Sequence, residues 1–265
     1  MKTLLQSIGF ATRYNAWNAL SGLSRYVRFI GLILANSGDS LRRPRLTVTQ
    51  VHVSGNRSLA IIGVSGLFVG FVLSLQLYTL LARYGSAELA GLAVNLALVR
   101  ELGPVVTALL FAGRAGTALT AEIGLMKAGD QLTAMSMMGV NPVRRIMTPR
   151  FWGGFIAMPL LAAVFSVMGL IGAWIIVVVL VGADSGGFWS QMQANVDWWH
   201  DIGQGLLKSV VFGSVVTSIA LFIGYESEPT PEGVANATTK TVVISSLAVL
   251  ALDFILTAFM FSTSK

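Results

Sequence analysis

Long uninterrupted apolar runs dominate the hydrophobic pattern of the chain. Residues 59–82 and 151–183 contain no charged side chain, and neither run alternates between apolar and polar positions. As a helix, the first run would be about 36 Å long, more than the roughly 30 Å of a bilayer's hydrocarbon core. A transmembrane β-barrel would instead show alternating segments of about ten residues. The pattern therefore predicts an all-α integral membrane protein.

Three further apolar segments have the length of a membrane crossing. We expect five transmembrane helices in a membrane domain of residues 58–265, at about residues 59–82, 89–113, 151–183, 203–225 and 241–262. In the first span, Gly66 and Gly70 form a small-xxx-small pattern, which permits close approach of a second helix. The third span is longer than one crossing requires, which predicts a tilt, a bend near Pro159 or a partly interfacial segment.

Residues 1–57 precede the first span and carry one apolar stripe at helical spacing. The stripe leaves Arg25 and Arg28 to one side, and its members are Trp17, Leu20, Leu23, Val27, Ile30 and Leu34. This predicts an amphipathic helix in the cytoplasmic interface whose arginines reach anionic headgroups. A helix packed on another subunit is the alternative. The first residues, MKTLLQSIGFATRYNAW, lack the sustained apolar region of a signal peptide.

The distribution of charge sets the expected orientation. Only 11% of the 265 residues are charged, against about 25% in soluble domains. With the N-terminus in the cytoplasm, fourteen Lys and Arg residues fall in inner segments and three in outer ones. The net charge of +6 is thus explained by membrane orientation and does not indicate a nucleic-acid partner. The chain has no cysteine, and His52 and His200 lie too far apart in sequence to suggest a metal site.

Charged residues inside the spans are candidates for function. Arg100 and Glu101 lie in the second span and Asp253 in the fifth. A charge at the bilayer centre costs about 2.5 to 3.5 kcal/mol, so these side chains should face protein or a wet cavity. Pro104 also frees a backbone carbonyl one turn earlier. We predict a polar site in a substrate cavity at Arg100 and Glu101, with an ion pair to another helix as the alternative. For Asp253 a structural role is favoured.

The segment from Arg114 to Arg150 is expected to be a cytoplasmic excursion. Its part from Arg114 to Pro142 is too polar to span and is expected to form short amphipathic helices. Its apolar positions are Ile123, Met126, Leu132, Met135 and Met138, and its polar ones include Glu122, Lys127 and Asp130. Gly139 and Asn141–Pro142 end it. A methionine-rich face is deformable and suits contact with a soluble partner, although a re-entrant or interfacial helix fits equally well.

Four stretches of the chain together resemble one family. They are VSGLFVGFVLSLQ, RELGPVVTALLFAGRAGTALTAEIGLMKAGDQLTAM, NPVRRIMTPRFW and ATTKTVVISSLAVLALDFILTAFMF. These long ungapped strings resemble the MlaE family of ABC-transporter permeases, which move phospholipid between the two membranes of Gram-negative bacteria and so maintain outer-membrane lipid asymmetry. The chain departs from the family at one position, where Asp130 precedes Gln131 in place of the usual Glu and shortens the reach of the carboxylate.

The resemblance implies a set of partners in the bacterial inner membrane. Family members form a homodimer around a central lipid cavity, and each protomer binds a cytoplasmic ABC ATPase that carries the ATP and magnesium. A STAS-domain protein sits on that ATPase, and a periplasmic hexamer of MCE-domain proteins covers the outer face. The chain has no G-x-x-x-x-G-K-[ST] motif, so it is expected to bind no nucleotide cofactor and to be a transport subunit rather than an enzyme.

The resemblance also implies roles for individual residues. Arg100 and Glu101 would lie near the cavity and meet lipid headgroups, and acyl chains would lie against first-span residues at helical spacing: Leu73, Leu77, Leu80 and Tyr84. Ordinary helix packing or lipid contact is the alternative for these four. The ATPase-coupling helix would include Glu122, Met126, Asp130, Gln131 and Met135.

Two other functions remain open from the residues. One is an ion-coupled secondary transporter in which Glu101 and Asp253 are protonation sites, and the other is a non-transporting scaffold that anchors peripheral proteins.

Overall fold

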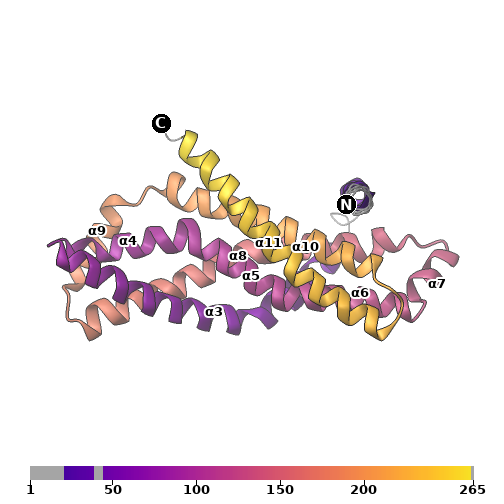
Figure 1. The fold of residues 1–265 in the computed structure, drawn as a ribbon, viewed down its shortest axis with the longest axis horizontal. Helices are drawn as coiled ribbons and strands as arrows, with labels where there is room; N and C mark the ends of the chain where they lie inside the picture. Colours follow the sequence, from indigo (N-terminus) through magenta and orange to yellow (C-terminus); the bar gives the residue numbers. More distant parts are fainter. Residues whose placement is uncertain (1–20, 39–43, 264–265) are drawn as a thin grey trace, which may run out of the picture.

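The computed structural model describes residues 21–38 and 44–263, and all regular structure within these ranges is helical. Five helical rods are long and apolar enough to cross a membrane: Pro44–Arg83, Ala87–Ala128, Val143–Leu180, Trp198–Glu226 and Pro231–Met260. They are called rods 1 to 5 below. Four of them run along the long axis of a bundle, and rod 5 crosses the bundle obliquely (Figure 1). The predicted all-α membrane fold with five spans is confirmed.

Most rods consist of several helical segments in sequence. Rod 1 is α3 (Pro44–Arg83), and rod 2 comprises η1 (Ala87–Leu89), α4 (Ala90–Leu96), η2 (Ala97–Leu102), α5 (Gly103–Phe111), η3 (Ala112–Gly116) and α6 (Thr117–Ala128). Rod 3 comprises η4 (Val143–Met147), α8 (Thr148–Trp174) and η5 (Ile175–Leu180), and rod 4 comprises η6 (Trp198–Ile202) and α10 (Gly203–Glu226). Rod 5 is the part of α11 (Pro231–Thr263) that ends at Met260. The segments η2 to η6 are π-helical turns, which are rare and often mark functional positions.

Two short helices join rods at opposite ends of the bundle (Figure 1). Helix α7 (Gln131–Met137) connects rods 2 and 3, and α9 (Ser185–Asn195) connects rods 3 and 4. These ends are called the α7 end and the α9 end. Asp184 caps α9 by accepting a hydrogen bond from the backbone N–H of Gly187.

Rod 2 is longer than the sequence pattern predicts. The expected end of the second span near residue 113 is not a helix end, because the helix continues through α6 to Ala128. The polar residues of α6 do not break it, since Leu119, Ile123 and Gly124 pack a buried face against rods 4 and 5. The break comes at Asp130, whose φ of 54° is left-handed. Asp tolerates this conformation better than Glu does, which gives a local reason for Asp at this position.

Rods 1 and 3 are joined by a seam of small residues. A methyl group added at Gly66 would lie 2.6 Å from the carbonyl oxygen of Phe165, and one added at Gly70 would overlap that of Gly169. The backbones of α3 and α8 are therefore nearly in contact, as the small-xxx-small pattern predicts. Helix α8 runs through Pro159 without ending, and the long third span includes π-helical turns at both ends of α8.

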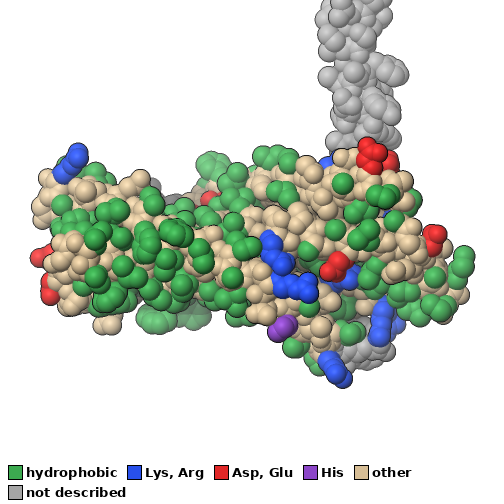
Figure 2. Space-filling view, turned by 90° about the horizontal axis from the view of Figure 1, so that it is seen from below, with side chains coloured by type: hydrophobic (Ala, Val, Ile, Leu, Met, Phe, Trp, Pro, Cys, Tyr) green, Lys and Arg blue, Asp and Glu red, His purple; other side chains and the backbone are tan. Residues whose placement is uncertain are grey.

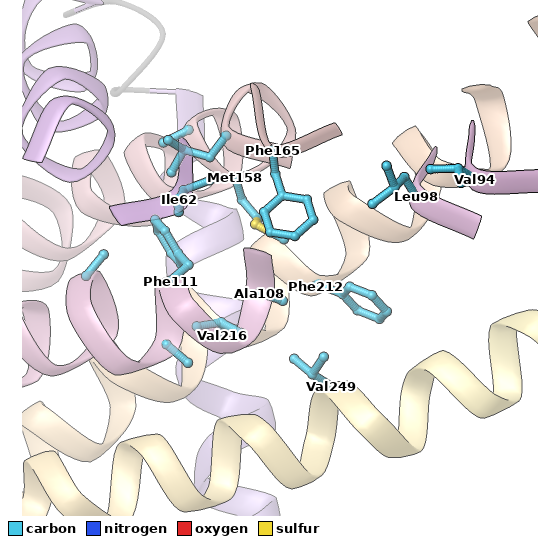
Figure 3. Packing of buried hydrophobic residues seen from close by; sticks show 14 of the residues in the cluster. Ile62, Val94, Leu98, Ala108, Phe111, Met158, Phe165, Phe212, Val216 and Val249 are labelled. Atoms are coloured by element: carbon cyan, nitrogen blue, oxygen red, sulfur yellow. The ribbon is translucent and has the colours of Figure 1, made fainter. Parts of the chain in front are cut away.

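One apolar core occupies the centre of the bundle. Phe111 from α5, Met158 and Phe165 from α8, and Phe212 from α10 are fully buried and interdigitate there (Figure 3). Val249 of α11 closes the core from the side of rod 5 (Figure 3). The core thus fixes rods 2, 3 and 4 relative to one another.

The helix in residues 21–38 packs against the bundle near the α7 end. Phe29 and Ile33 are buried there in a second apolar cluster, and Tyr26 shares a hydrogen bond of 2.7 Å with Ser218 of α10. Burial raises the pKa of the Tyr26 hydroxyl, and the hydrogen bond to Ser218 acts in the opposite direction.

The predicted apolar stripe of this helix is largely exposed. Leu23, Val27 and Leu34 point away from the bundle, as an interfacial helix requires. Trp17 and Leu20 lie outside the described residues. The Nε of Arg25 lies 3.2 Å from a carboxylate oxygen of Glu226. Contact of Arg25 and Arg28 with headgroups stays a prediction.

Charged and apolar side chains separate along the surface. On the face in Figure 2, most Lys and Arg side chains lie over the half of the molecule that contains the α7 end, and apolar side chains cover much of the other half. Trp189, Trp198 and Trp199 are exposed around α9 and η6, which is typical of a membrane–water interface.

Candidate functional site

A buried lysine organises the polar centre of the membrane domain. Lys208 lies one turn and a half into α10, and its side chain is only 1% exposed. Its Nζ donates hydrogen bonds to the carboxylate of Glu101 and, at 2.6 Å, to the Thr257 hydroxyl. The same nitrogen lies 3.1 Å from Oδ1 of Asp253. We call these four residues the Lys208 network.

The Lys208 network joins three rods. Glu101 comes from the π-helical turn η2 of rod 2, Lys208 from rod 4, and Asp253 and Thr257 from successive turns of rod 5. The Thr257 hydroxyl also lies 3.3 Å from Glu101 Oε2, so the groups from all three rods contact one another. A buried ammonium requires such partners, because an unpaired charge in a low-dielectric interior is strongly unfavourable.

A second ion pair lies on the α9 side of the first. Arg100 donates from Nε to Asp201 Oδ1 at 2.6 Å and also from Nη2 to the same oxygen. Asp201 is buried in η6, where its other oxygen accepts the backbone N–H of Asp197 at 2.9 Å. The π-helical turn η2 thus supplies Arg100 of this pair, and the π-helical turn η6 supplies Asp201.

The adjacent charges of rod 2 therefore have different partners. Successive helical side chains point about 100° apart, so Arg100 reaches η6 whereas Glu101 reaches α10 and α11. The ion pair to another helix, which was the alternative for these residues, is present for both. Neither contact is sealed, however, since the side chains of Arg100 and Glu101 are 36% and 41% exposed in the single chain.

The predicted acyl-chain residues follow one stripe of α3. Leu73 and Leu77 are half-buried against the central core, whereas Leu80 and Tyr84 are exposed near the α9 end. The stripe thus offers apolar surface that one copy of the chain leaves partly uncovered. Its role in a lipid cavity stays a prediction.

The predicted coupling residues divide between two helices and their junction. Glu122 and Met126 lie on α6 rather than on a separate short helix, and both contact the buried Arg150 at the start of α8, Glu122 through an ion pair of 3.0 Å. Asp130 forms the left-handed junction, and Gln131 and Met135 lie on α7.

Three members of the polar centre were not found from the sequence. They are Lys208, Asp201 and Thr257. The presence of Glu101 and Asp253 in predicted spans could have indicated Lys208, because acids inside a membrane require a cation at the same depth. No group of three or more His, Asp and Glu residues within the described ranges is placed to hold a metal ion.

Comparison with known proteins places the chain in a family. The family model described as Permease MlaE matches residues 47–259. The intermembrane phospholipid transport system permease protein MlaE of Haemophilus influenzae is 56% identical over 216 residues, which cover 82% of this chain and 83% of that protein.

More distant relatives match over the same share of the chain. A probable ABC transporter permease protein of Rickettsia typhi is 32% identical over 82% of this chain and 83% of its own length. The chloroplastic protein TRIGALACTOSYLDIACYLGLYCEROL 1 of Arabidopsis thaliana is 29% identical over 82% of this chain and 62% of its own length. The match covers every element from α3 to most of α11, and the chain belongs to the MlaE permease family.

Proposed function

We propose that this chain is the permease subunit of an ABC transporter that moves phospholipids between the inner and outer membranes and so maintains outer-membrane lipid asymmetry. The observation that carries the proposal is the 56% identity, over most of both chains, to a protein named as an intermembrane phospholipid transport permease. Five apolar rods and a polar centre that is open to one side support it.

The proposed assembly is a homodimer in the bacterial inner membrane, with the N-terminus in the cytoplasm and the C-terminus in the periplasm. The basic half of the surface supports a cytoplasmic position for the α7 end, by the positive-inside rule. A cytoplasmic ABC ATPase would hold the ATP and magnesium and carry a STAS-domain protein, and an MCE-domain hexamer would cover the α9 end.

Helix α7 is the proposed contact for the ATPase. Leu132 anchors the helix to the bundle, whereas Met137 is 83% exposed and the neighbouring Met138 is also exposed. Two large apolar side chains at the tip of a cytoplasmic connection are typical of a docking surface. Movement of α7 would reach rod 2 through the Asp130 junction and rod 3 through the contact between Glu122 and Arg150.

The Lys208 network is the proposed headgroup end of the transport path. A lipid phosphate is anionic, so it would attract the ammonium of Lys208 and the guanidinium of Arg100 and compete with their carboxylate partners. Acyl chains would lie along the stripe of Leu73, Leu77, Leu80 and Tyr84 in a cavity between two copies. Because the network joins rods 2, 4 and 5, a change in rod 5 would alter the access of the headgroup to these cations.

Purification followed by reconstitution tests this function. The full chain, isolated from its native membrane with the subunits that stay bound, is placed in vesicles containing fluorescent phospholipid, and transfer to an acceptor is followed with and without ATP. We expect a co-purifying ATPase and ATP-dependent transfer. Transfer that follows a proton gradient without ATP would favour an ion-coupled carrier, and absence of transfer in a fully assembled complex would favour a scaffold.

Two variants test the proposed path within the assembled complex. Glu101→Gln removes one charge of the network, and Leu73→Trp adds bulk to the predicted cavity wall. We expect each to lower ATP-dependent transfer about tenfold, the effect of about 1.4 kcal/mol on a barrier. Glu88→Gln and Leu75→Trp are matched controls, because both residues are exposed outside the network and the stripe. Normal transfer by both test variants would remove this assignment.

A further inference from the structure

Two adjoining hollows form a groove on the outer side of rods 2, 3 and 4. The first has a volume of about 270 Å³, and Pro104, Pro159, Ala163 and Leu206 are among its lining residues. The second has a volume of about 200 Å³ and is lined by Val167, Leu170, Ile171, Trp174 and Trp189. Val167 and Leu170 line both hollows, which makes the groove continuous along α8. None of the residues assigned above to the lipid cavity lines it.

The groove is long enough to cover the depth of one membrane leaflet. Pro159 and Trp174 lie at its two ends on α8 and are separated by about 22 Å at the helical rise of 1.5 Å per residue. One leaflet of a hydrocarbon core is about 15 Å thick, half of the whole. The two tryptophans at the outer end mark the interfacial level on the α9 side, so the groove runs from that interface to about the middle of the bilayer.

The lining of the groove selects an apolar occupant. Its walls are mainly aliphatic, and the Ser209 hydroxyl within it is already hydrogen-bonded to the carbonyl of Leu206 at 2.7 Å. Asn95 and Ser166 are the other polar side chains of the lining. The remaining lining residues are apolar or glycine, so an apolar occupant matches most of the surface of the groove.

The volume of the groove suits a hydrocarbon chain better than a whole helix. A helix with its side chains is about 10 to 12 Å wide, so only single side chains of a helix would enter hollows of 200 and 270 Å³. The same volumes hold about fifteen methylene groups if each takes roughly the 30 Å³ of a water molecule. That is the size of a single acyl chain of a membrane lipid.

We infer that this groove is a lipid site on each protomer, separate from the cavity proposed between protomers, and that it holds one acyl chain of a phospholipid from the leaflet on the α9 side. The headgroup lies beside Trp174 and Trp189, and the end of the chain lies between Pro104 and Pro159. The inference rests on the proposed function only in requiring that the chain spans a bilayer.

Photocrosslinking in a bilayer tests the site. The full complex is placed in nanodiscs of phosphatidylethanolamine and phosphatidylglycerol that contain a phosphatidylethanolamine with a diazirine in the middle of one acyl chain. After illumination, labelled peptides are identified by mass spectrometry. We expect labelling of α8 between Ala162 and Leu170 to exceed that of Leu247 and Phe254, which are exposed on α11.

Paired variants separate the groove from general lipid contact. Leu206→Trp fills the groove, and Leu207→Trp is its control, because Leu207 is also exposed but does not line the groove. On α8, Ala163→Phe also fills the groove, and Leu160→Phe is its control, because Leu160 is exposed but does not line the groove. Loss of two buried methylene contacts predicts a fall in groove labelling of about tenfold for each filling variant, with no change for either control. The second pair provides the test if one filling variant does not fold.

Three results would overturn the inference. They are equal labelling of α8 and of the exposed α11 residues, unchanged labelling in both filling variants, and crosslinks that show a protein segment seated in the groove. Each would leave the proposed function standing, because that function is tested by ATP-dependent transfer and by residues outside the groove.

Discussion

The seam between α3 and α8 and the Lys208 network are two different ways of joining helices in a membrane. At the seam, Gly66 and Gly70 bring one backbone against the other, and the contact contains almost no side chain. At the network, the ammonium of Lys208 on α10 pairs with one carboxylate from rod 2 and one from α11, and little of rod 5 is buried. Between helices in lipid, close van der Waals packing and polar contacts replace the hydrophobic effect.

The difference indicates which junction can change. Close-packed backbones have one good arrangement, because a small shift costs many contacts at once. An ion pair whose carboxylate is partly exposed can exchange one partner for another, such as a lipid phosphate or water. Rod 5 is therefore the element expected to move, and rods 1 and 3 the frame against which it moves.

The largest expected effect is at the centre of the network. Lys208→Met removes the cation and leaves the carboxylates of Glu101 and Asp253 without it, which should lower the free energy of unfolding by about 3 kcal/mol or more. The midpoint of thermal unfolding in detergent, followed by size-exclusion chromatography, measures this.

A compensating variant sharpens the interpretation of the lysine substitution. In Lys208→Met combined with Glu101→Gln and Asp253→Asn no uncompensated charge remains, so much of the lost stability should return. If the triple variant is as unstable as Lys208→Met alone, packing rather than charge explains the loss.

A single methyl group added at the seam should lower the stability of the fold. Gly70→Ala places a methyl group where the Gly169 carbonyl lies, so the two backbones must separate, at a cost of about 1 to 3 kcal/mol. Gly63→Ala is the control on the same helix, since its methyl group would lie 3.8 Å from Met168 in ordinary contact. Equal unfolding midpoints for the two variants would contradict the close-packed seam.

The smallest effect concerns the hydroxyl of the network. Thr257→Val keeps the shape of the side chain and removes one hydrogen-bond partner of Lys208, which should lower stability by about 1 kcal/mol. The same thermal assay detects this change. A loss as large as that of Lys208→Met would mean that the hydroxyl, and not the carboxylates, is the main partner of the ammonium.

The sequence predicted the spans and the seam well, because both depend on local composition. Apolar length identifies a rod wherever it packs, and glycine spacing identifies a face that another helix can approach. The sequence was less informative on where rod 2 ends. Polar residues such as Glu122 suggested an excursion, but they lie on a helix whose opposite face is buried, so polarity on one side did not end it.

The candidate site was located only in part. Arg100 and Glu101 stood out because charge is rare in a span, and Asp253 for the same reason. Their partners could not be assigned, because each contact joins residues about one hundred positions or more apart, as between Arg100 and Asp201, or between Glu101 and Thr257. Lys208 did not stand out, because a lysine near a helix end usually extends to the interface, whereas here it is buried.

By itself the sequence determined that this protein is a bundle of five membrane helices with a few costly charges, because hydrophobic length and the penalty for buried charge are properties of single segments. Only the tertiary structure decided that Lys208 pairs with two acids from different rods, that Arg100 pairs with Asp201, and that three rods leave a groove between them. Those outcomes depend on which helices meet and at what depth, and the hydropathy of a single segment does not specify its neighbours.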